Sequence, residues 1–313
     1  MLLGLTTVIR PRNEHTIATD CEVSGRGYWS GKAVTVRFRP SFACTGVTFT
    51  RTDILGRPSC KANAAFASGA SMRTNLISGS ASFQMIEHVM SALYAMEIDN
   101  CIVEIDGEEL PGMDGSSLAY VDALRSAGMV MQAAARKRFI VDRLMRVGNS
   151  EAWIEVSPSP RGCASFEYRL DYGTGSVVPE QSCSHLLTPS QYYREIASAR
   201  TFVTAEQAAM LRQNGVGVHV TNGDLIVFAA DGTVVGNELR FKNECARHKT
   251  LDMIGDLALA GGDLLGKFVS FRGGHRLNAE LATLLTKHAA DSVMSMGTGS
   301  QFAPPLSQRS RVA

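Results

Sequence analysis

The sequence predicts a globular protein of two domains, each containing both strands and helices. The chain has 313 residues, 45% of them hydrophobic, which is enough for one large core or two ordinary ones. A length near 300 residues favours two domains of about 100 to 200 residues each. The order of patterns points the same way, because strand-like alternation and helical periodicity occur in the first half and then again in the second.

In the first half, strand patterns precede two helical ones. Residues 33–50 read AVTVRFRPSFACTGVTFT, an alternation of apolar and polar residues around a Pro/Ser break that predicts two half-buried strands joined by a turn. Apolar residues at helical spacing predict a helix over 85–97, and CIVEI predicts a strand over 101–105. A second helix is expected over 117–126, closed by Gly128.

In the second half, strand and helix patterns occur again after a basic segment. We place the seam between domains in MQAAARKRFI, where charge is concentrated at residues 136–138. We expect strands at 153–156, 165–170 and 225–229, and helices at 190–199, 206–214, 244–260 and 277–289. Gly261 and Gly262 are a natural left-handed stop for the third of these helices. The tail after Gly297 is expected to be disordered.

Charge and cysteine usage restrict the classes of protein. Lys plus Arg number 31 and Asp plus Glu number 30, so no broad field favours nucleic acid or an anionic membrane, and no nucleic-acid partner is expected. The seven cysteines are scattered and odd in number, which favours free thiols in a reducing compartment. The first residues lack the basic region and cleavage site of a signal peptide, and no window reaches the roughly 18 apolar residues of a membrane span. We therefore expect a soluble, cytoplasmic protein.

Three of the seven histidines have surroundings that packing does not readily explain. His88 follows Glu87, His248 precedes Lys249, and His275 stands in a glycine loop. The other four are interpreted as ordinary surface or core histidines, namely His15, His185, His219 and His288.

Polar residues on one predicted helix suggest a metal site. His248, Asp252 and Asp256 are spaced i, i+4, i+8, which places them on one stripe of the helix. Catalytic zinc commonly has three His or carboxylate ligands and an open position for water. His248 and Asp252 supply two ligands, and His88 is a candidate for the third. Glu87 would then sit beside the metal as a base.

Less specific interpretations of these residues stay open at this point. A His-x-x-x-Asp spacing on a helix is more often a surface ion pair than a set of ligands. His275, within RGGHRLN, could simply cap a helix. Spacing alone therefore suggests a hydrolase without proving one.

Five blocks of sequence, taken in order, point to one family. They are GYWSGKAVTVRFRPSFACTGVTFTRTD, MIEHVMSALYAMEIDNCIVEIDGEELPGMDGSS, ASARTF, LRFKNECARHKTLDMIGDLALAG and GGHRLN. In these blocks, which run through most of the chain, the sequence resembles the UDP-3-O-acyl-N-acetylglucosamine deacetylases, the zinc amidases of lipid A synthesis. Five matches in order and at fitting separations make chance similarity improbable.

The resemblance implies roles for the candidate residues. One Zn²⁺ per chain, or Fe²⁺ in its place, would be held by His88, His248 and Asp252. Glu87 would be the general base. His275 would stabilise the oxyanion and protonate the leaving amine, with Asp256 as its orienting carboxylate.

Three further residues acquire substrate contacts from the same resemblance. Lys249 matches a lysine near the scissile amide and the substrate phosphates. Thr201 matches a side chain that helps to hold the oxyanion, and Phe202 matches a ring that packs on the sugar.

The resemblance also implies a fold. It is α+β, with two similar domains, each a small sheet with two helices, packed helix layer to helix layer around an active site in the cleft between them. We expect the first domain over 1–131, the second over 132–297 and a tail over 298–313. An inserted βαβ element at about 203–228 would form the passage for the acyl chain of the substrate.

Departures from the family pattern fall mostly outside the predicted metal site. Tyr28-Trp29-Ser30-Gly31 stands where the family usually has Leu-His-Thr-Gly, and Gln84-Met85-Ile86 where it has Ser-Thr-Val. Asn222-Gly223-Asp224 replaces a Leu-Asp-Asn stretch in the inserted element, and Asn243 replaces an acidic residue. These changes bear on the contacts with the acyl chain and the sugar and leave the hydrolytic residues intact.

The implied function is hydrolysis of the 2-acetamido group of an acylated UDP-N-acetylglucosamine by a monomeric enzyme, with release of acetate. Two alternatives stay open. One is a zinc amidase of the same build that acts on a different acylated or unacylated amino sugar. The other is a non-catalytic binding module, since the same small α+β fold occurs in proteins without this activity. The retained ligands, base and acid favour an enzyme.

Overall fold

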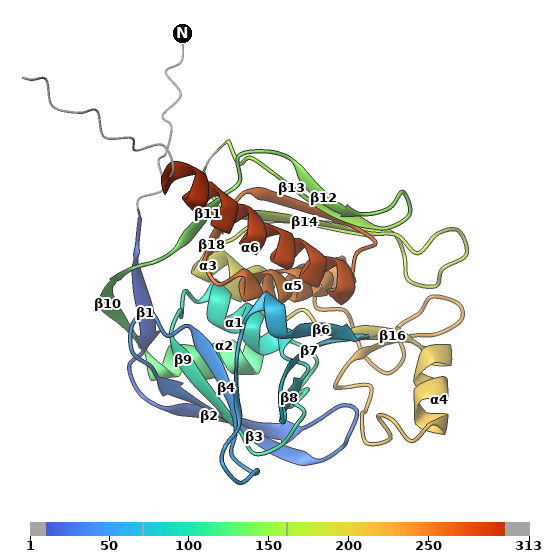
Figure 1. Ribbon diagram of the computed structural model, residues 1–313. Coiled ribbons are helices and arrows are strands. Elements are labelled where there is room, and N and C mark those ends of the chain that lie inside the picture. Colours follow the sequence, from blue (N-terminus) through green and yellow to red (C-terminus); the bar gives the residue numbers. More distant parts are fainter. Residues whose placement is uncertain (1–10, 71, 161, 298–313) are drawn as a thin grey trace, which may run out of the picture.

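Two five-stranded sheets enclose a layer of helices in the computed structural model, which describes residues 11–70, 72–160 and 162–297 (Figure 1). The first sheet has the order β2 (Cys21–Arg26), β3 (Ala33–Pro40), β9 (Cys101–Ile105), β4 (Val47–Arg51) and β5 (Ser59–Lys61). The strands predicted over 33–50 are therefore present as β3 and β4. They do not pair with each other, because β9 lies between them, antiparallel to β3 and parallel to β4.

The second sheet repeats the topology of the first. Its order is β12 (Met145–Gly148), β13 (Trp153–Ser157), β19 (Lys267–Phe271), β14 (Ser165–Leu170) and β15 (Gln181–Leu186). In both sheets the strand that comes last in the chain lies in the middle, and it is parallel to one neighbour and antiparallel to the other. The two halves thus share an architecture that the sequence does not display as a repeat.

Helices from the two halves face one another between the sheets. They are α1 (Glu87–Ala95) and α2 (Leu118–Ala127) from the first half and α5 (Glu244–Leu257) and α6 (His275–Gly297) from the second. Helix α1 packs against α5, and α5 packs on β14 and β15 of its own sheet. The predicted α+β fold with two facing helix layers is confirmed (Figure 1).

Most helix ends agree with the signals in the sequence. Helix α5 continues as a short 3₁₀ turn and stops at Gly261, which has a left-handed φ of 81°. Helix α2 stops at Gly128 as expected. Helix α3 (Pro189–Glu195) is shorter than the predicted 190–199, and α6 begins at His275, two residues before the predicted start.

Two smaller units flank the helix layer. A three-stranded sheet contains β6 (Ala67–Ala70), β7 (Arg73–Ser78) and β8 (Ala81–Gln84). A βαβ unit consists of β16 (Phe202–Thr204), α4 (Ala205–Gln213) and β17 (Ile226–Phe228), with its two strands parallel. Helix α4 has a capping box formed by Thr204 and Gln207 and lies at the outer edge of the molecule (Figure 1).

The predicted seam between domains consists of strands. β1 (Asn13–Ile17) pairs with β10 (Met129–Ala135), and β11 (Arg138–Ile140) pairs with β18 (Asp263–Leu265). The proposed boundary after residue 131 falls inside β10, and the division into domains remains a proposal.

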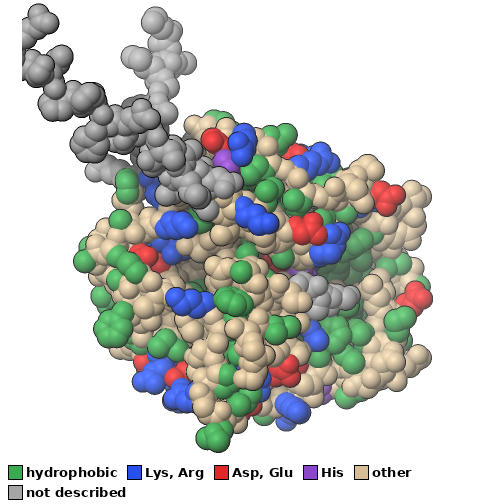
Figure 2. Space-filling model, viewed as in Figure 1, with side chains coloured by type: hydrophobic (Ala, Val, Ile, Leu, Met, Phe, Trp, Pro, Cys, Tyr) green, Lys and Arg blue, Asp and Glu red, His purple; other side chains and the backbone are tan. Residues whose placement is uncertain are grey.

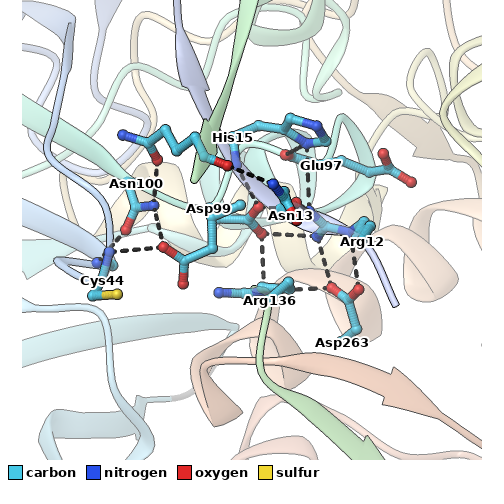
Figure 3. A network of polar contacts seen from close by, with 12 residues as sticks. Arg12, Asn13, His15, Cys44, Glu97, Asp99, Asn100, Arg136 and Asp263 are labelled. Atoms are coloured by element: carbon cyan, nitrogen blue, oxygen red, sulfur yellow. Dashed lines mark hydrogen bonds and ion pairs between the residues drawn. The ribbon is translucent and has the colours of Figure 1, made fainter. Parts of the chain in front are cut away.

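Ion pairs join the two halves at this seam (Figure 3). Arg12 donates to Asp263 through Nε and Nη2, at 2.9 and 2.7 Å, and to Asp99 through Nη1 and Nη2, at 2.6 and 2.8 Å. Arg136 completes the group, with its Nε 2.9 Å from Asp99 and 3.4 Å from Asp263. We call these four residues the seam network.

One hydrophobic core runs through both halves. All seven cysteines lie in the described residues and are free, as predicted. None of the helices in the described part of the chain is both long enough and apolar enough to cross a membrane. The tail predicted over 298–313 lies outside the described residues.

Candidate metal centre and active site

The candidate site forms where α1 crosses α5. At the crossing Gly255 has no side chain, and a Cβ atom there would stand 2.0 Å from the backbone oxygen of Glu87. The close approach brings the first turn of α1 beside the C-terminal half of α5. On the other side of this turn Met85, with a φ of 61°, redirects the chain from β8 into α1.

His88, His248 and Asp252 converge at this crossing. All three are buried, and their candidate ligand atoms lie within 4.8 Å of one another. Nε2 of His88 lies 3.6 Å, and Nε2 of His248 lies 3.4 Å, from Oδ1 of Asp252.

The carboxylate of Asp252 is incomplete without a ligand. Its Oδ2 accepts a hydrogen bond from Nζ of Lys249 at 2.7 Å, whereas its buried Oδ1 accepts none from the described residues. A buried charged oxygen without a partner is costly. A cation held between Oδ1 and the two imidazoles would satisfy it, so the residues present fit a divalent metal.

The electrostatic surroundings keep these groups in the forms that bind metal. Nδ1 of His248 lies 3.1 Å from the carbonyl oxygen of Ala199, which can only accept, so Nε2 presents its lone pair to the site. Burial lowers the pKa of His248 to about 4. Burial alone would raise the pKa of Asp252, but His248 and Lys249 hold it well below its usual value. A neutral imidazole and an ionised carboxylate are the states required of ligands.

Glu87 is the first residue of α1 and lines the same cavity as the three candidate ligands. Its Oε2 accepts a hydrogen bond at 3.0 Å from the backbone N–H of Thr74. Burial raises the pKa of Glu87, and the charges of His275 and His88 oppose this effect. The carboxylate is consequently more basic than an exposed one, which suits a general base.

His275 and Asp256 form a buried pair next to the candidate ligands, since Nε2 of His275 lies 3.8 Å from Oδ2 of Asp252. Nδ1 of His275 lies 3.0 Å from Oδ2 of Asp256. Burial favours the neutral imidazole, but the Asp256 carboxylate outweighs it and raises the pKa of His275 to about 9. His275 is therefore a cation at neutral pH and can donate a proton from Nε2.

Two residues without an assigned role in the sequence complete this pair. Asp256 accepts hydrogen bonds from Oγ1 of Thr74 at 2.6 Å and from Nδ2 of Asn278 at 2.8 Å. Asn278 lies three residues after His275 in the block GGHRLN, so helical spacing could have indicated it. Thr74 stands in a strand whose pattern carries no such signal, although it contacts both Glu87 and Asp256.

A cavity of about 1080 Å³ connects these residues with the βαβ unit. Thr201 and Phe202 line it at the start of β16, and the Phe202 ring meets the His248 ring edge-on, with centroids 6.5 Å apart. Lys249 also lines it. The end beside α4 is lined by apolar residues that include Ala208, Leu211, Val216, Leu225 and Val227. Hydrophobic side chains gather on this side of the molecule, at the right of Figure 2.

The structure thus gathers all nine predicted site residues around one cavity. Asp256 is the one of the nine that does not line it, because it lies fully buried behind His275. None of the four histidines left without a role lines the cavity, although His219 belongs to a loop of the βαβ unit in which Gly217, Val220 and Thr221 do.

Comparisons with known proteins agree with the geometry. A family model described as UDP-3-O-acyl N-acetylglycosamine deacetylase matches residues 14–287. A curated protein named UDP-3-O-acyl-N-acetylglucosamine deacetylase from Brucella ovis is 34% identical over 273 residues, which cover 87% of this chain and 94% of the relative. Relatives of the same name from Brucella canis and Brucella melitensis match with the same identity and coverage.

Proposed function

Because the chain belongs to the UDP-3-O-acyl-N-acetylglucosamine deacetylase family, we infer that it is a metal-dependent hydrolase that removes the acetyl group from a UDP-3-O-acyl-N-acetylglucosamine in lipid A synthesis. The observation that carries this conclusion is the convergence of two imidazoles and an unpaired carboxylate oxygen beside a buried base and a cationic histidine. These groups supply the ligands, the base and the acid that metal-assisted hydrolysis of an amide uses.

The proposed metal is zinc, one ion per chain, held by His88, His248 and Asp252. Two imidazoles and one carboxylate suit zinc and would also hold Fe²⁺. When bound, zinc polarises the amide carbonyl and lowers the pKa of water, which makes a nucleophile available at neutral pH. Because Lys249 donates its hydrogen bond to Oδ2, Asp252 would hold the ion through Oδ1.

Glu87 and His275 would divide the proton transfers. Glu87 accepts the proton of the attacking water, and the N–H of Thr74 fixes the orientation of its carboxylate. His275, held by Asp256, stabilises the developing oxyanion together with the Thr201 hydroxyl and then donates its proton to the leaving amine. The products are acetate and the free amine, and no covalent intermediate with the protein is needed.

The rest of the cavity would bind the substrate. Phe202 offers a ring to the sugar beside the metal ligands, and Lys249 a positive charge near the scissile amide and the phosphates. The apolar end, inside the βαβ unit at about 203–228, is proposed as the passage for the acyl chain. A monomer acting in the cytoplasm, with domains at 1–131 and 132–297, completes the proposal.

A turnover assay tests this function. The purified enzyme should release acetate from a 3-O-acylated UDP-N-acetylglucosamine, lose activity on treatment with a chelator and regain it with Zn²⁺. Glu87→Gln, which keeps the shape of the base, should bind metal but show little turnover. Equal or faster hydrolysis of unacylated UDP-N-acetylglucosamine would instead favour a zinc amidase with another substrate. Binding without hydrolysis of either compound would favour a non-catalytic module.

A further inference from the structure

The segment 28–31, which departs from the family pattern, is anchored firmly to the first half of the chain. The backbone N–H groups of Trp29 and Ser30 donate to the two carboxylate oxygens of Glu109, at 2.7 and 2.8 Å. Glu109 is buried. Charge-assisted hydrogen bonds of this kind are short and strong, so the segment is a fixed part of the cavity wall.

Tyr28 extends from this segment to the inserted element. Its hydroxyl donates a hydrogen bond at 2.5 Å to the backbone oxygen of Asp224, 196 residues away in the sequence. Asp224 closes a turn in which its carboxylate accepts from both the N–H and the hydroxyl of Thr221, at 2.8 Å each. Two of the places where the sequence departs from its family are therefore in contact with each other.

A second contact supports the same junction. Gly31 has a φ of 67°, and a Cβ atom there would lie 2.8 Å from Nδ1 of His219. The ring of His219 thus packs directly on the backbone of the anchored segment. The loop 217–224 consequently rests on the first half of the chain at two separate points.

This junction lies close to Thr201, because a Cβ atom at Gly115 would meet the backbone oxygen of Asp224, the Tyr28 hydroxyl and Cγ2 of Thr201, at 2.6, 2.8 and 3.1 Å. Tyr28, Gly217, Val220 and Thr221 all line the cavity. The backbone of nearby Thr201 is held by other groups, because its N–H donates to Gly115 at 2.8 Å and its oxygen accepts from Ile226 at 2.9 Å. Loss of the Tyr28 hydroxyl should therefore leave the catalytic end in place.

We propose that Tyr28 is a specificity-determining residue, which holds the loop 217–224 against the first half and so sets the shape of the cavity end that receives the acyl chain. This inference rests on the proposed function. Tyr28 shapes the wall and does not contact the reacting amide. Its contribution should therefore depend on how far the substrate extends into the apolar end.

The test is a series of UDP-N-acetylglucosamines with 3-O-acyl chains of increasing length, together with the unacylated compound. In the wild-type enzyme, kcat/KM should rise by up to about fourfold per added methylene until the passage is filled. Tyr28→Phe removes only the hydroxyl. We expect this variant to equal the wild type on the unacylated compound and to fall behind as the chain lengthens, by about fivefold to tenfold for the longest.

A matched control is available in Tyr94. Tyr94 is partly buried, its hydroxyl accepts a hydrogen bond at 2.9 Å from the N–H of Leu264 in the other half, and it does not line the cavity. Tyr94→Phe should leave the dependence on chain length unchanged. His219→Ala removes the second contact and should weaken the dependence of kcat/KM on chain length, as Tyr28→Phe does. This variant provides the test if Tyr28→Phe fails to fold.

The outcomes separate this inference from the proposed function. Suppose that the wild-type enzyme prefers acylated substrates. If kcat/KM of Tyr28→Phe or His219→Ala then falls by the same factor on every substrate, or does not fall at all, the role of Tyr28 in specificity is overturned and the proposed function stands. A wild-type enzyme that hydrolyses no acylated compound would overturn the proposed function and this inference with it.

Discussion

The seam network and the candidate metal centre both bury charge where the two halves meet, but they differ in completeness. In the seam network every carboxylate oxygen of Asp99 and Asp263 has a partner, supplied by Arg12, Arg136 and the N–H of His15 (Figure 3). Two positive and two negative charges balance within the group. Nothing further is needed to satisfy it.

In the candidate metal centre, by contrast, one carboxylate oxygen is left without a hydrogen bond from the described residues. Oδ2 of Asp252 accepts a hydrogen bond from Lys249, whereas Oδ1 accepts none from the part of the chain that the structure describes. Two imidazole nitrogens lie 3.4 and 3.6 Å from Oδ1. Burying charge without a partner destabilises a fold. The seam network, in which every carboxylate oxygen has a partner, is therefore a structural group, whereas the metal centre, with a carboxylate oxygen left unpaired by the described residues, is arranged around a ligand.

Removal of a metal ligand should give the largest effect. His248→Ala and Asp252→Ala should each lose most of their metal on dialysis and about a thousandfold in kcat/KM, because the metal contributes several kcal/mol to stabilising the transition state. Metal per chain and initial rates measure both effects. His288→Ala, which changes a histidine that does not line the cavity, should keep its metal. Full occupancy in both ligand variants would remove these residues from the ligand set.

Breaking the seam network should affect stability and leave the chemistry alone. Asp99→Asn leaves the two guanidinium groups without one of their two carboxylates. Because the Arg12 side chain is 21% exposed, the ion pair is partly buried and breaking it costs about 2 kcal/mol. We expect that loss in the free energy of unfolding, measured by denaturant titration, with unchanged metal content and kcat/KM in the folded enzyme. A variant that kept its stability but lost metal would show that the two clusters are not independent.

The comparison also shows what the sequence can reveal. Helical periodicity predicted α1 and α5, and the spacing of His248 and Asp252 placed two candidate ligands on one face, because neighbours on a helix are neighbours in the sequence. The third candidate, His88, was only weakly indicated by pattern and rested on the resemblance to a family. Its distance from Asp252 depends on the helix crossing at Gly255, which local sequence does not encode.

Contacts between distant segments account for most of what the sequence did not predict. The position of β9 between β3 and β4 is a matter of sheet order, which alternation within a strand does not specify. Thr74 resembles any polar strand residue, and the contact of Arg12 with Asp263 requires that the two halves of the chain lie against each other. The Tyr28 contact with Asp224 is of the same kind, although both positions were recognised as departures from the family.

The smallest expected effect concerns the proton donor His275. Its charge is paired with Asp256, whereas the carboxylate of Asp252 has an oxygen that the described residues leave unpaired. If Glu87 must be ionised and His275 protonated, activity rises and then falls with pH. The pKa of Glu87 is raised by burial, so the acidic limb should lie above the usual carboxylate range. The pKa of His275 is raised to about 9, so its proton is present at neutral pH and is lost as the pH passes through that value.

Asp256→Asn tests this assignment, because it removes the charge that favours the imidazolium and keeps a polar side chain of similar size. The pKa of His275 should fall, and the basic limb of kcat/KM should move to lower pH by about one to two units with the metal still bound. A pH profile on enzyme of verified metal content makes the measurement. Since the Asn278 and Thr74 contacts hold Asp256 on its other sides, the substitution should shift the limb more than it disturbs the position of the ring. An unmoved basic limb in the metal-replete variant would mean that His275 is not the titrating acid, and the limb would then belong to the attacking water.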